Sequence, residues 1–440
     1  MTKRRQYPHT GEEQLDARDR AVLVGVDRGS AAWPVEESLA ELERLAHTAG
    51  SDVVASVTQR MDRPNPRTFI GAGKAEEIAR VSADAGASVV IFDDELSPRQ
   101  QANLEDLIPE TKVLDRTALI LDIFALHATS REGKLQVELA QLEYVLPRLR
   151  GMWGHLEAER LGGGRGARFG AGESQLEVDR RMTRKRISEL KADLRKVSAE
   201  REVQRKSRAG SGVFRVALVG YTNAGKSTLL NRLTGADVLA YDMLFATLDS
   251  TTRRLALPEG REIVLTDTVG FINKLPHGLV DAFRSTLDEV READLLLHVV
   301  DASHSQREAQ MQAVREVLQE IDSAEKPAVI VMNKIDSVEA DDLERLEKRF
   351  RGAVFVSGLT GSGADALMHR IAEEASRGSV NLTALVPYTR GDLVKLAHER
   401  TQLLSERHTA EGTMLVLRAP QSVVPAFEQY LVGSEDGAES

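Results

Sequence analysis

The stretch GYTNAGKST, Gly220 to Thr228, constrains the fold more than any other part of the chain. It lies between the apolar run VFRVALVG and a helical pattern, and it fits G-x-x-x-x-G-K-[ST], a phosphate-binding loop placed between a strand and a helix. Its two glycines permit a tight turn whose backbone N–H groups point at phosphates, and the positive end of the helix dipole adds to them. Lys226 is placed to reach the β- and γ-phosphate oxygens, and Ser227 to bind Mg²⁺. The stretch predicts an α/β domain that binds a nucleoside triphosphate.

Two later motifs identify the base as guanine. NKID at 333–336 follows a second buried strand, and the Asp336 carboxylate can accept hydrogen bonds from guanine N1–H and N2–H₂, a donor pair that adenine lacks. A site built on such hydrogen bonds rejects the wrong partner by roughly 10⁴ or more. Asn333 is placed to tie this loop to the phosphate loop, and the Lys334 stem to lie on the base. SGL at 357–359 would turn backbone N–H groups toward guanine O6.

A switch loop is expected between the first helix and the second strand of this domain. The candidate is YDMLFATLDSTTRR, in which Thr247 is the predicted second hydroxyl on Mg²⁺, with Thr251 and Thr252 as alternatives. The turn TDTVG ends the next strand. There Asp267 is predicted to hold the metal through water, and the Gly270 N–H to meet the γ-phosphate. These contacts vanish on hydrolysis, which relaxes both loops.

The residue after Gly270 is Phe271, close to the position where Ras-like and Gα-like enzymes carry a glutamine that orients the attacking water. A phenyl ring has no group that can hold a water. Either the chain does not hydrolyse nucleotide, or something outside this segment completes the site. Phe271 is also a candidate for a core side chain.

Residues 1–130 predict a small α/β domain, because apolar strands at 21–27, 52–57, 87–94 and 111–115 alternate with helical patterns. The stretch IGAGKAEEIA in this domain invites a phosphate-loop interpretation. It lacks the spacing of such a loop and the Ser or Thr after the lysine. We therefore expect a plain strand-to-helix turn there, which argues against ATP use through this domain.

Residues 131–210 predict an antiparallel helical hairpin with a glycine-rich tip. The connector RLGGGRGARFGAGESQLE cannot form a core, but its backbone can approach a ligand closely. Arg165, Arg168 and Phe169 in this connector are the candidate RNA contacts. Residues 207–212 are interpreted as a linker. The helical seam is predicted from apolar residues at three- and four-residue steps: Leu135, Leu139, Leu142, Leu146, Leu149, Ile187, Leu190, Leu194 and Val197.

Six strands are predicted within 213–378, giving a P-loop GTPase domain with a mixed, mostly parallel six-stranded sheet. Residues 381–432 predict a small α+β domain, and 433–440 an acidic tail. The whole chain is thus α/β: a small α/β domain, a helical hairpin, the GTPase domain and a small C-terminal domain.

Charge is distributed unevenly along the chain. The net charge is -10, but residues 160–208 carry 15 Lys and Arg against 7 Asp and Glu, so 15 − 7 = +8 there and -10 − 8 = -18 elsewhere. Such an island indicates one element that faces a polyanion, or a solvated helix face. There is no cysteine, no apolar region behind MTKRRQYPHT and no run of the ~20 apolar residues that a membrane span needs. We expect a cytoplasmic protein without a transmembrane segment.

Several stretches together resemble one family, the HflX-type GTPases of the Obg-related branch. They are EGKLQVELAQLEYVLPRLRG, LGGGRGARFGAGESQLEVDRR, GYTNAGKSTLLNRLTG, LFATLDSTTRR, DTVGFINKLP and, near the N-terminus, TFIGAGKAEEI. The glycine-rich tip with ESQLEVDRR is more specific than the phosphate loop. Departures are small: Ala171 and Ser174 stand where Pro and Thr are common, and Gly358 stands for Ala.

The resemblance implies a GTPase with slow intrinsic hydrolysis, because relatives have an apolar residue at the position of Phe271. It implies binding to the large (50S) ribosomal subunit through the N-terminal domain and the hairpin. A role in ribosome splitting, rescue or biogenesis follows from it. Asn223 resembles the asparagine that coordinates K⁺ in cation-assisted relatives, where the ion stabilises charge; the alternative is that it shapes the loop.

The predicted catalytic residues are Lys226, Asn223, Thr247 and Gly270, and the predicted ligands of Mg²⁺ are Ser227 and Thr247. The predicted nucleotide contacts are Gly220, Tyr221, Thr222, Asn223, Ala224, Gly225, Lys226, Ser227, Thr228, Phe245, Ala246, Thr247, Leu248, Asp249, Asp267, Thr268, Val269, Gly270, Asn333, Lys334, Ile335, Asp336, Ser357, Gly358 and Leu359.

The predicted partners are GTP or GDP and the large ribosomal subunit, with no DNA, and the chain is taken as a monomer. A second interpretation stays open at this point: an RNA-binding or RNA-remodelling NTPase in which nucleotide is mainly a conformational latch. Turnover of GTP with and without large subunits distinguishes the two.

Overall fold

The structure, a computed structural model, describes residues 19–29, 33–149, 171–209, 213–235, 244–245, 247–258, 260–274, 284–377, 379–420 and 423–432. The chain divides into two compact units. The first unit contains the described residues of 1–197 together with those of 241–249 and 272–284. The second unit contains those of 198–240, 250–271 and 285–440. Parts of both predicted switch segments therefore belong to the first unit.

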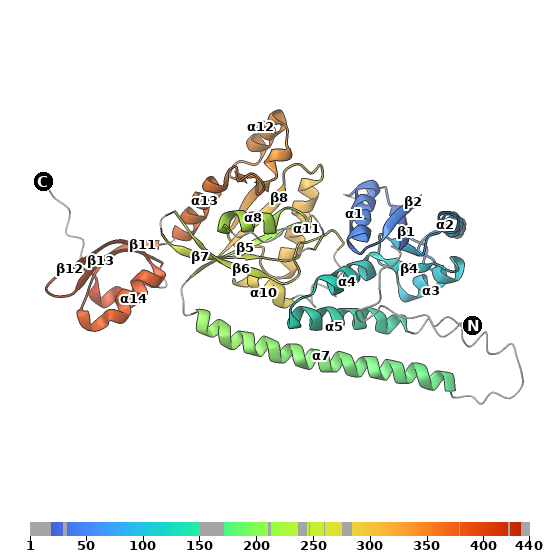
Figure 1. Cartoon of the computed structure of the whole chain (residues 1–440), viewed down its shortest axis with the longest axis horizontal. Coiled ribbons are helices and arrows are strands. Elements are labelled where there is room, and N and C mark those ends of the chain that lie inside the picture. The colour runs from blue at the N-terminus through green and yellow to red at the C-terminus, as the bar shows by residue number, and fades with distance from the viewer. Residues whose placement is uncertain are drawn as a thin grey trace, which may run out of the picture. The chain divides into compact units, whose positions relative to one another are not determined.

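The first unit contains a four-stranded sheet in which all strands are parallel, in the order β2-β1-β3-β4. Its central strands are buried along most of their length, as expected of a parallel sheet covered on both faces. The expected small α/β domain is confirmed (Figure 1). Its elements are β1 (Arg20–Asp27), α1 (Val35–Thr48), β2 (Asp52–Arg60), α2 (Ala72–Ala85), β3 (Val89–Phe92), α3 (Pro98–Leu107), β4 (Lys112–Asp115) and α4 (Arg116–His127).

The stretch IGAGKAEEIA forms a turn that leads into helix α2, as expected, but no strand precedes it. β2 ends at Arg60, and the backbone turns back through paired hydrogen bonds between Asn65 and Phe69. The Gly71 N–H donates to Gln59 Oε1, 3.0 Å away, and Lys74 pairs with Glu77 within α2. The Gly71 N–H and the Lys74 ammonium are thus engaged within the domain, and a second nucleotide site here is not supported.

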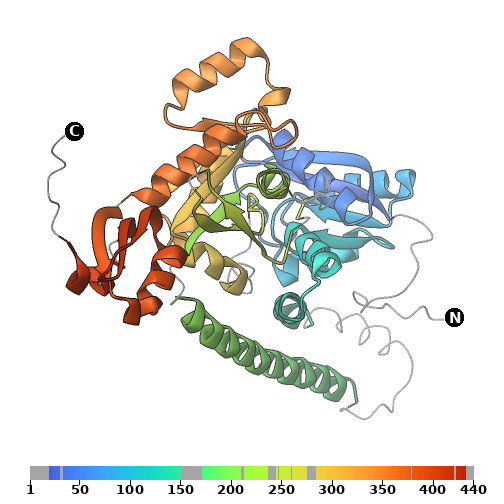
Figure 2. The same ribbon diagram turned by 60° about the vertical axis from the view of Figure 1, so that its left-hand side comes forward.

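The helical hairpin consists of α5 (Arg131–Arg148) and α7 (Ala171–Ala209). Leu139, Ile187 and Leu190 are buried between them, and Leu135, Leu142, Leu146 and Leu194 pack against these three, as the seam predicts. Figure 2 shows α7 as one unbroken helix. Residues 207–209, expected as linker, are its last turn. The predicted RNA contacts at the tip, Arg165, Arg168 and Phe169, lie outside the described residues.

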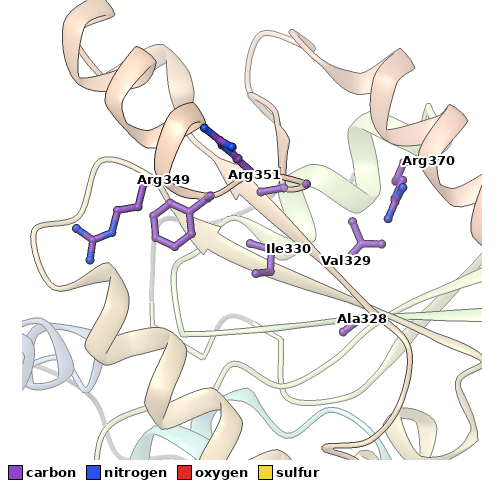
Figure 3. A pocket seen from close by; sticks show the side chains of 9 residues that line it. Ala328, Val329, Ile330, Arg349, Arg351 and Arg370 are labelled. Carbon is purple, nitrogen blue, oxygen red and sulfur yellow. The ribbon is translucent and has the colours of Figure 1, made fainter.

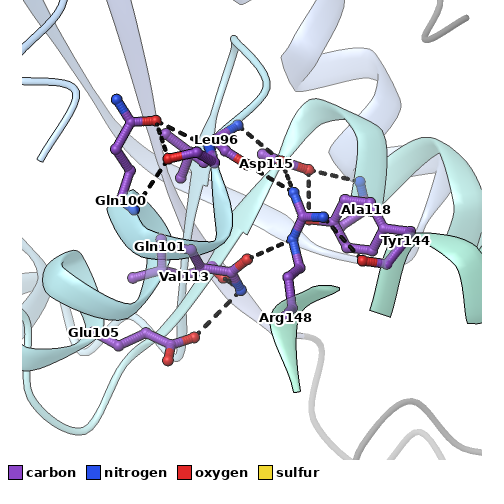
Figure 4. A network of polar contacts seen from close by, with 10 residues as sticks. Leu96, Gln100, Gln101, Glu105, Val113, Asp115, Ala118, Tyr144 and Arg148 are labelled. Atoms are coloured by element: carbon purple, nitrogen blue, oxygen red, sulfur yellow. Dashed lines mark hydrogen bonds and ion pairs between the residues drawn. The ribbon is translucent and has the colours of Figure 1, made fainter. Parts of the chain in front are cut away.

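The buried carboxylate of Asp115 connects the C-terminal end of α5 to the α/β domain. Asp115 is 0% exposed; it caps α4 through the Ala118 N–H at 2.8 Å and also accepts the Leu96 N–H at 3.0 Å. From α5 it receives the Tyr144 hydroxyl at 2.9 Å and the Arg148 guanidinium at 3.3 Å (Figure 4). Burial, together with the negative charge of Asp115, raises the pKa of the Tyr144 hydroxyl far above its ordinary value. This end of α5 is therefore held rigidly to the sheet.

The second unit contains a six-stranded sheet in the order β10-β9-β8-β5-β7-β6, in which only β6 is antiparallel among the described strands. The expected mixed, mostly parallel sheet is confirmed. Its elements are β5 (Phe214–Gly220), α8 (Lys226–Thr234), β6 (Thr251–Ala256), β7 (Glu262–Asp267), α10 (Arg284–Glu292), β8 (Leu295–Asp301), α11 (Arg307–Glu320), β9 (Ala328–Asn333), η1 (Ile335–Ser337), α12 (Ala340–Arg349), β10 (Val354–Phe355) and α13 (Ala364–Ser376).

The last part of the second unit is a three-stranded antiparallel sheet, β11-β13-β12, with α14 on one face (Figure 1). Alternate residues of β11, Leu382, Ala384 and Val386, point into the core beneath α14. The bounds are β11 (Ser379–Val386), η2 (Tyr388–Arg390), α14 (Gly391–Arg400), β12 (Gln402–His408), β13 (Thr413–Pro420), α15 (Val424–Phe427) and η3 (Glu428–Tyr430). The predicted tail, 433–440, lies outside the described residues. Among the described helices, none has the length and apolar character that crossing a membrane requires.

Candidate guanine-nucleotide site

The phosphate loop connects β5 to α8. Neighbouring atoms lie so close to its two glycines that neither position has room for a side chain. A Cβ on Gly220 would lie 2.2 Å from the Val299 carbonyl oxygen of the neighbouring strand β8. Gly225 has φ +85°, and a Cβ there would lie 2.3 Å from Asn333 Nδ2. The first glycine thus lets two strands converge, and the second lets the base-recognition loop approach the phosphate loop.

Lys226 begins α8 with its side chain folded into the loop. Its Nζ donates to the carbonyl oxygens of Gly220 and Tyr221, at 3.2 and 3.0 Å, and the residue is 6% exposed. Burial lowers the pKa of this ammonium to about 8, although the nearby Asp267 carboxylate raises it in part. Phosphate oxygens at this loop would favour the charged form, so the ammonium is placed to bind a polyanion.

Asn223 adopts φ +58°, a conformation that asparagine tolerates better than most residues. The backbone conformation of Asn223 therefore fits the alternative role, in which this residue shapes the phosphate loop. The hydroxyl of the preceding Thr222 is buried and has no hydrogen-bond partner among the described residues. Such an orphaned group inside a phosphate loop fits a site that binds a polar ligand.

The D-x-x-G turn that follows β7 lies directly on the phosphate loop. A Cβ on Gly270 would lie 2.9 Å from Thr222 Cα and 3.1 Å from Lys226 Nζ, so glycine is required there. The Thr268 hydroxyl donates to the Leu218 carbonyl of β5 at 2.7 Å. The Gly270 amide is thus held beside Lys226, the lysine predicted to reach the γ-phosphate.

The residues predicted to hold Mg²⁺ at the phosphate loop fit that ion. The Ser227 hydroxyl donates to Asp267 Oδ2 at 2.6 Å, and Asp267 is buried. A hydroxyl beside a carboxylate at the start of α8 is the oxygen-donor pair with which phosphate-loop enzymes bind Mg²⁺. When bound, the ion would neutralise charge on the β- and γ-phosphates.

Phe271 is a core side chain, 2% exposed. Its N–H donates to the Gly220 carbonyl at 3.1 Å, and its carbonyl accepts the Thr222 N–H at 2.7 Å, so it extends the sheet beside the phosphate loop. The sequence left open whether this residue is structural, and its burial answers the question. The side chain is turned away from solvent and cannot orient a water.

Asn333, at the end of β9, joins the three loops that are predicted to contact the nucleotide. Its Nδ2 donates to the Ala224 carbonyl at 2.8 Å, and its Oδ1 accepts the Gly358 N–H at 2.9 Å. Lys334 has a positive φ of +63°. The exposed carboxylate of Asp336 accepts a hydrogen bond from the Ser357 hydroxyl. The Lys334 ammonium pairs with Asp301 at 2.8 Å. The geometry presents one oriented carboxylate at the sheet edge, as guanine recognition requires.

Arg232 of α8 was not among the predicted site residues, yet it holds the last loop in place. Its guanidinium donates to the carbonyls of Gly358 and Leu359, the former at 3.2 Å. A methyl group on Gly358 would lie 3.3 Å from the Leu229 amide nitrogen, which explains why glycine suits this position. Leu359 is 69% exposed. No local sequence pattern predicts this role of Arg232, because its hydrogen-bond acceptors are backbone carbonyls more than 120 residues later in the sequence.

Four predicted nucleotide contacts, Phe245, Thr247, Leu248 and Asp249, belong to the first unit, while the phosphate loop belongs to the second. Ala246 lies outside the described residues. Phe245 and Leu248 are buried, and Phe245 packs edge-on against Phe124 of α4 with ring centroids 4.6 Å apart. Asp249, predicted as a nucleotide contact, has its carboxylate bound by residues of the first unit instead. Burial acts to raise its pKa, but hydrogen bonds from Ser130 and Thr129 outweigh that effect and lower it.

A separate cavity of about 350 Å³ opens beside β9 in the second unit and carries three arginines, Arg349, Arg351 and Arg370 (Figure 3). Arg349 pairs with Glu308, and Arg370 with two glutamates of α13. Figure 3 shows the three guanidinium groups pointing in different directions. They therefore do not converge on one anion.

A phosphate loop after β5, a D-x-x-G turn after β7 and N-K-x-D after β9 define a P-loop guanine-nucleotide-binding protein. Family models described as GTP-binding GTPase N-terminal, GTP-binding GTPase Middle Region and 50S ribosome-binding GTPase match residues 36–125, 127–208 and 215–334. The chain belongs to the HflX family of GTPases and hydrolyses GTP to GDP and phosphate.

The family assignment rests on relatives that match over nearly their whole length. GTPase HflX of Lacrimispora saccharolytica is 46% identical, over 93% of this chain and 96% of the relative. GTPase HflX of Escherichia coli is 45% identical, over 93% of this chain and 95% of the relative. A solved structure titled "crystal structure of SsGBP and GDP complex" is 28% identical and covers 82% of this chain and 99% of that one, with a TM-score of 0.45.

Proposed function

We propose that this GTPase completes its active site only when it binds the large ribosomal subunit, through the N-terminal domain and the hairpin. It would act in splitting or rescuing ribosomes, or in their biogenesis. The observation that carries the proposal is the burial of Phe271, because the side chain that follows Gly270 therefore cannot orient the attacking water. Slow intrinsic turnover follows, because positioning of the nucleophile supplies much of the acceleration in phosphoryl transfer.

The hairpin supports the choice of a ribosomal partner. On the described part of α7, the side chains of Arg181, Arg184 and Arg195 are exposed and form no ion pair with any described residue. By contrast, Arg186 and Lys191 pair with Glu138 and Glu143 of α5. One set of basic residues thus joins the two helices, and the other faces solvent at the place where a phosphate backbone would bind. The description of the matched 50S ribosome-binding GTPase model agrees with this partner.

In the proposed reaction the chain's own groups bind and orient the nucleotide. Lys226 and the loop amides hold the phosphates, Asp336 selects guanine, and Ser227 with Thr247 would hold Mg²⁺. The Gly270 N–H donates to the γ-phosphate as charge develops on it. K⁺ beside Asn223 would add positive charge at the same phosphates.

Turnover and binding by a hairpin-tip variant test the proposal. Replacing Arg165 and Arg168 by alanine should lower turnover stimulated by the large subunit at least tenfold and leave GTP affinity unchanged, because the tip is remote in sequence from every nucleotide motif. A matched control replaces two exposed arginines outside the hairpin, Arg351 and Arg407. Stimulation of the tip variant equal to that of the wild-type chain would remove the tip from the mechanism.

The interpretation of nucleotide as a conformational latch predicts a different result in the same assay. A latch binds GTP and GDP with different effects on RNA affinity, but large subunits do not accelerate its turnover. Binding to the subunit that depends on GTP, with phosphate release at the intrinsic rate, would favour the latch.

A further inference from the structure

Asp249 links the predicted switch segment to the first turn of the hairpin helix α5. One carboxylate oxygen, Oδ2, accepts the Thr129 N–H at 3.0 Å, the Thr129 hydroxyl at 2.6 Å and the Ser130 N–H at 2.7 Å. The other oxygen, Oδ1, accepts the Ser130 hydroxyl. All these residues lie in the first unit. Four donors on one carboxylate make a charge-assisted anchor much stronger than a single surface hydrogen bond.

The anchor is built into the helix start. Ser130 is the N-cap of α5, where its hydroxyl also accepts the Gly133 N–H at 2.9 Å. A Cβ on Gly133 would lie 2.7 Å from Asp249 Oδ1, so only glycine lets the carboxylate come this close. A negative charge at the N-terminal end of an 18-residue helix is also favoured by the helix dipole. Asp249 thus serves as part of the cap of α5.

The neighbouring switch residues are held on both sides of Thr247. Leu248 is buried, and Phe245 packs on Phe124 of α4. Thr247 is therefore flanked by two fixed side chains and by the Asp249 anchor two residues further on. A residue of an exposed loop loses backbone entropy when a ligand orders it, and this anchoring reduces that loss at Thr247.

A second anchor holds the other switch segment, four residues after Gly270. The Lys274 ammonium pairs with Asp93 Oδ2 at 2.5 Å and with Asp94 Oδ1 at 3.0 Å, at the carboxyl end of β3. Asp93 is itself held by Arg116 and by the Ser38 hydroxyl, both at 2.7 Å. This second anchor therefore holds the segment that follows the D-x-x-G turn within the first unit.

We propose that Asp249 is a positioning residue for the reaction: by capping α5 it holds Thr247 ready to bind Mg²⁺, and it transmits movement of the hairpin to the metal site. The transmission part rests on the proposed function, since it assumes that the ribosome engages the hairpin. The positioning part does not, because it concerns the free protein.

Nucleotide affinities of the full chain test the positioning part. Thr247 is predicted to contact Mg²⁺ only when the γ-phosphate is present, so Asp249→Ala should weaken a non-hydrolysable GTP analogue about tenfold and leave GDP affinity unchanged. The Mg²⁺ concentration for half-maximal turnover should rise by a similar factor. Asp62→Ala, which removes an exposed carboxylate of the first unit, is the matched control and should change neither.

A partner variant checks that Asp249 acts through the start of α5. Thr129→Val removes one hydroxyl donor without touching the helix cap or the nucleotide site, and should weaken the GTP analogue about threefold. The double variant Asp249→Ala with Thr129→Val should be no weaker than Asp249→Ala alone, since the two groups form one interaction. Additive losses would contradict the coupling.

Two other results would overturn the positioning role. Equal losses of GDP and GTP-analogue affinity in Asp249→Ala would mean that the residue only maintains the fold, and unchanged affinity for both would mean that the anchor does not reach Thr247. The ribosome is tested separately. If large subunits fail to stimulate the wild-type chain, the proposed function fails, while the affinity ratio of Asp249→Ala still decides this inference.

Discussion

Replacing Phe271 by glutamine is the most informative single change, because it supplies the side chain that related enzymes use to orient water. The structure predicts that the substitution does not restore fast hydrolysis. Phe271 is buried, and both of its backbone groups are hydrogen-bonded beside β5. A glutamine there would enter the apolar core under the phosphate loop instead of the γ-phosphate pocket.

The expected loss in the free energy of unfolding follows from the apolar contacts that the core loses. Removing a buried phenylalanine ring costs about 3–5 kcal/mol, and a buried amide without partners adds about 1–3 kcal/mol. Glutamine keeps part of the side-chain volume, so we expect a net loss of about 3 kcal/mol or more. Phe271→Leu, the matched control, keeps the core apolar and should cost about 1–2 kcal/mol.

Hydrogen exchange of the β5 amides reports this loss, because Phe271 is bonded directly to the end of that strand, and single-turnover phosphate release reports the chemistry. We expect faster exchange in Phe271→Gln than in Phe271→Leu, with intrinsic hydrolysis no faster than wild type in either. Phe271→Gln protein that keeps wild-type exchange and hydrolyses GTP at least tenfold faster would refute the reasoning, since residue 271 would then reach the γ-phosphate.

Two further predictions concern the base and the fold. Asp336→Asn should weaken GTP at least tenfold and leave the much weaker competition by ATP unchanged, because only guanine offers two donors to the carboxylate; equal losses for both nucleotides would contradict base recognition by Asp336. Burial raises the pKa of Asp122 in α4 to about 6, and the charge of Lys112 counters part of this shift. Between pH 3.8 and 6 the carboxyl group therefore stays protonated in the folded chain but is ionised in the unfolded chain. The free energy of unfolding consequently falls as pH rises through that range. Asp122→Asn should therefore be more stable than wild type at pH 7, by at most about 3 kcal/mol, with the difference in urea unfolding shrinking toward zero near pH 4; a difference independent of pH would show that ionisation of Asp122 is not its cause.

Motifs with a fixed local geometry could be predicted from the sequence. The phosphate loop, the D-x-x-G turn and N-K-x-D each follow a buried strand in the structure, because apolar runs and glycine spacing determine these connections locally. The seam of the hairpin was predicted for the same reason, since apolar residues repeat at three- and four-residue steps within each helix. Leu139 of α5 and Ile187 and Leu190 of α7 are buried at that seam.

Interactions between distant parts of the chain could not be predicted. Asp249 is among the predicted nucleotide contacts, but its carboxylate binds Thr129 and Ser130, which are about 120 residues earlier. Lys274 likewise binds Asp93 across 181 residues. A single sequence contains no local pattern for such pairs, because they depend on how loops meet after the sheets have formed.

The composition of the chain led to a wrong prediction at the C-terminal end of α7. Residues 207–212, SRAGSG, read as a linker because Gly and Ser favour loops. Helix α7 nevertheless continues through Ala209. Propensity is a weak prior at a helix end, where one or two residues extend a long helix at little cost.

Multiple-turnover phosphate release by the full chain, with and without purified large ribosomal subunits and in K⁺ and then Na⁺, tests the central claim most directly. The account predicts slow release by the free protein and an increase of at least tenfold when subunits are added. Release by the free protein at the rate seen with saturating subunits would contradict it.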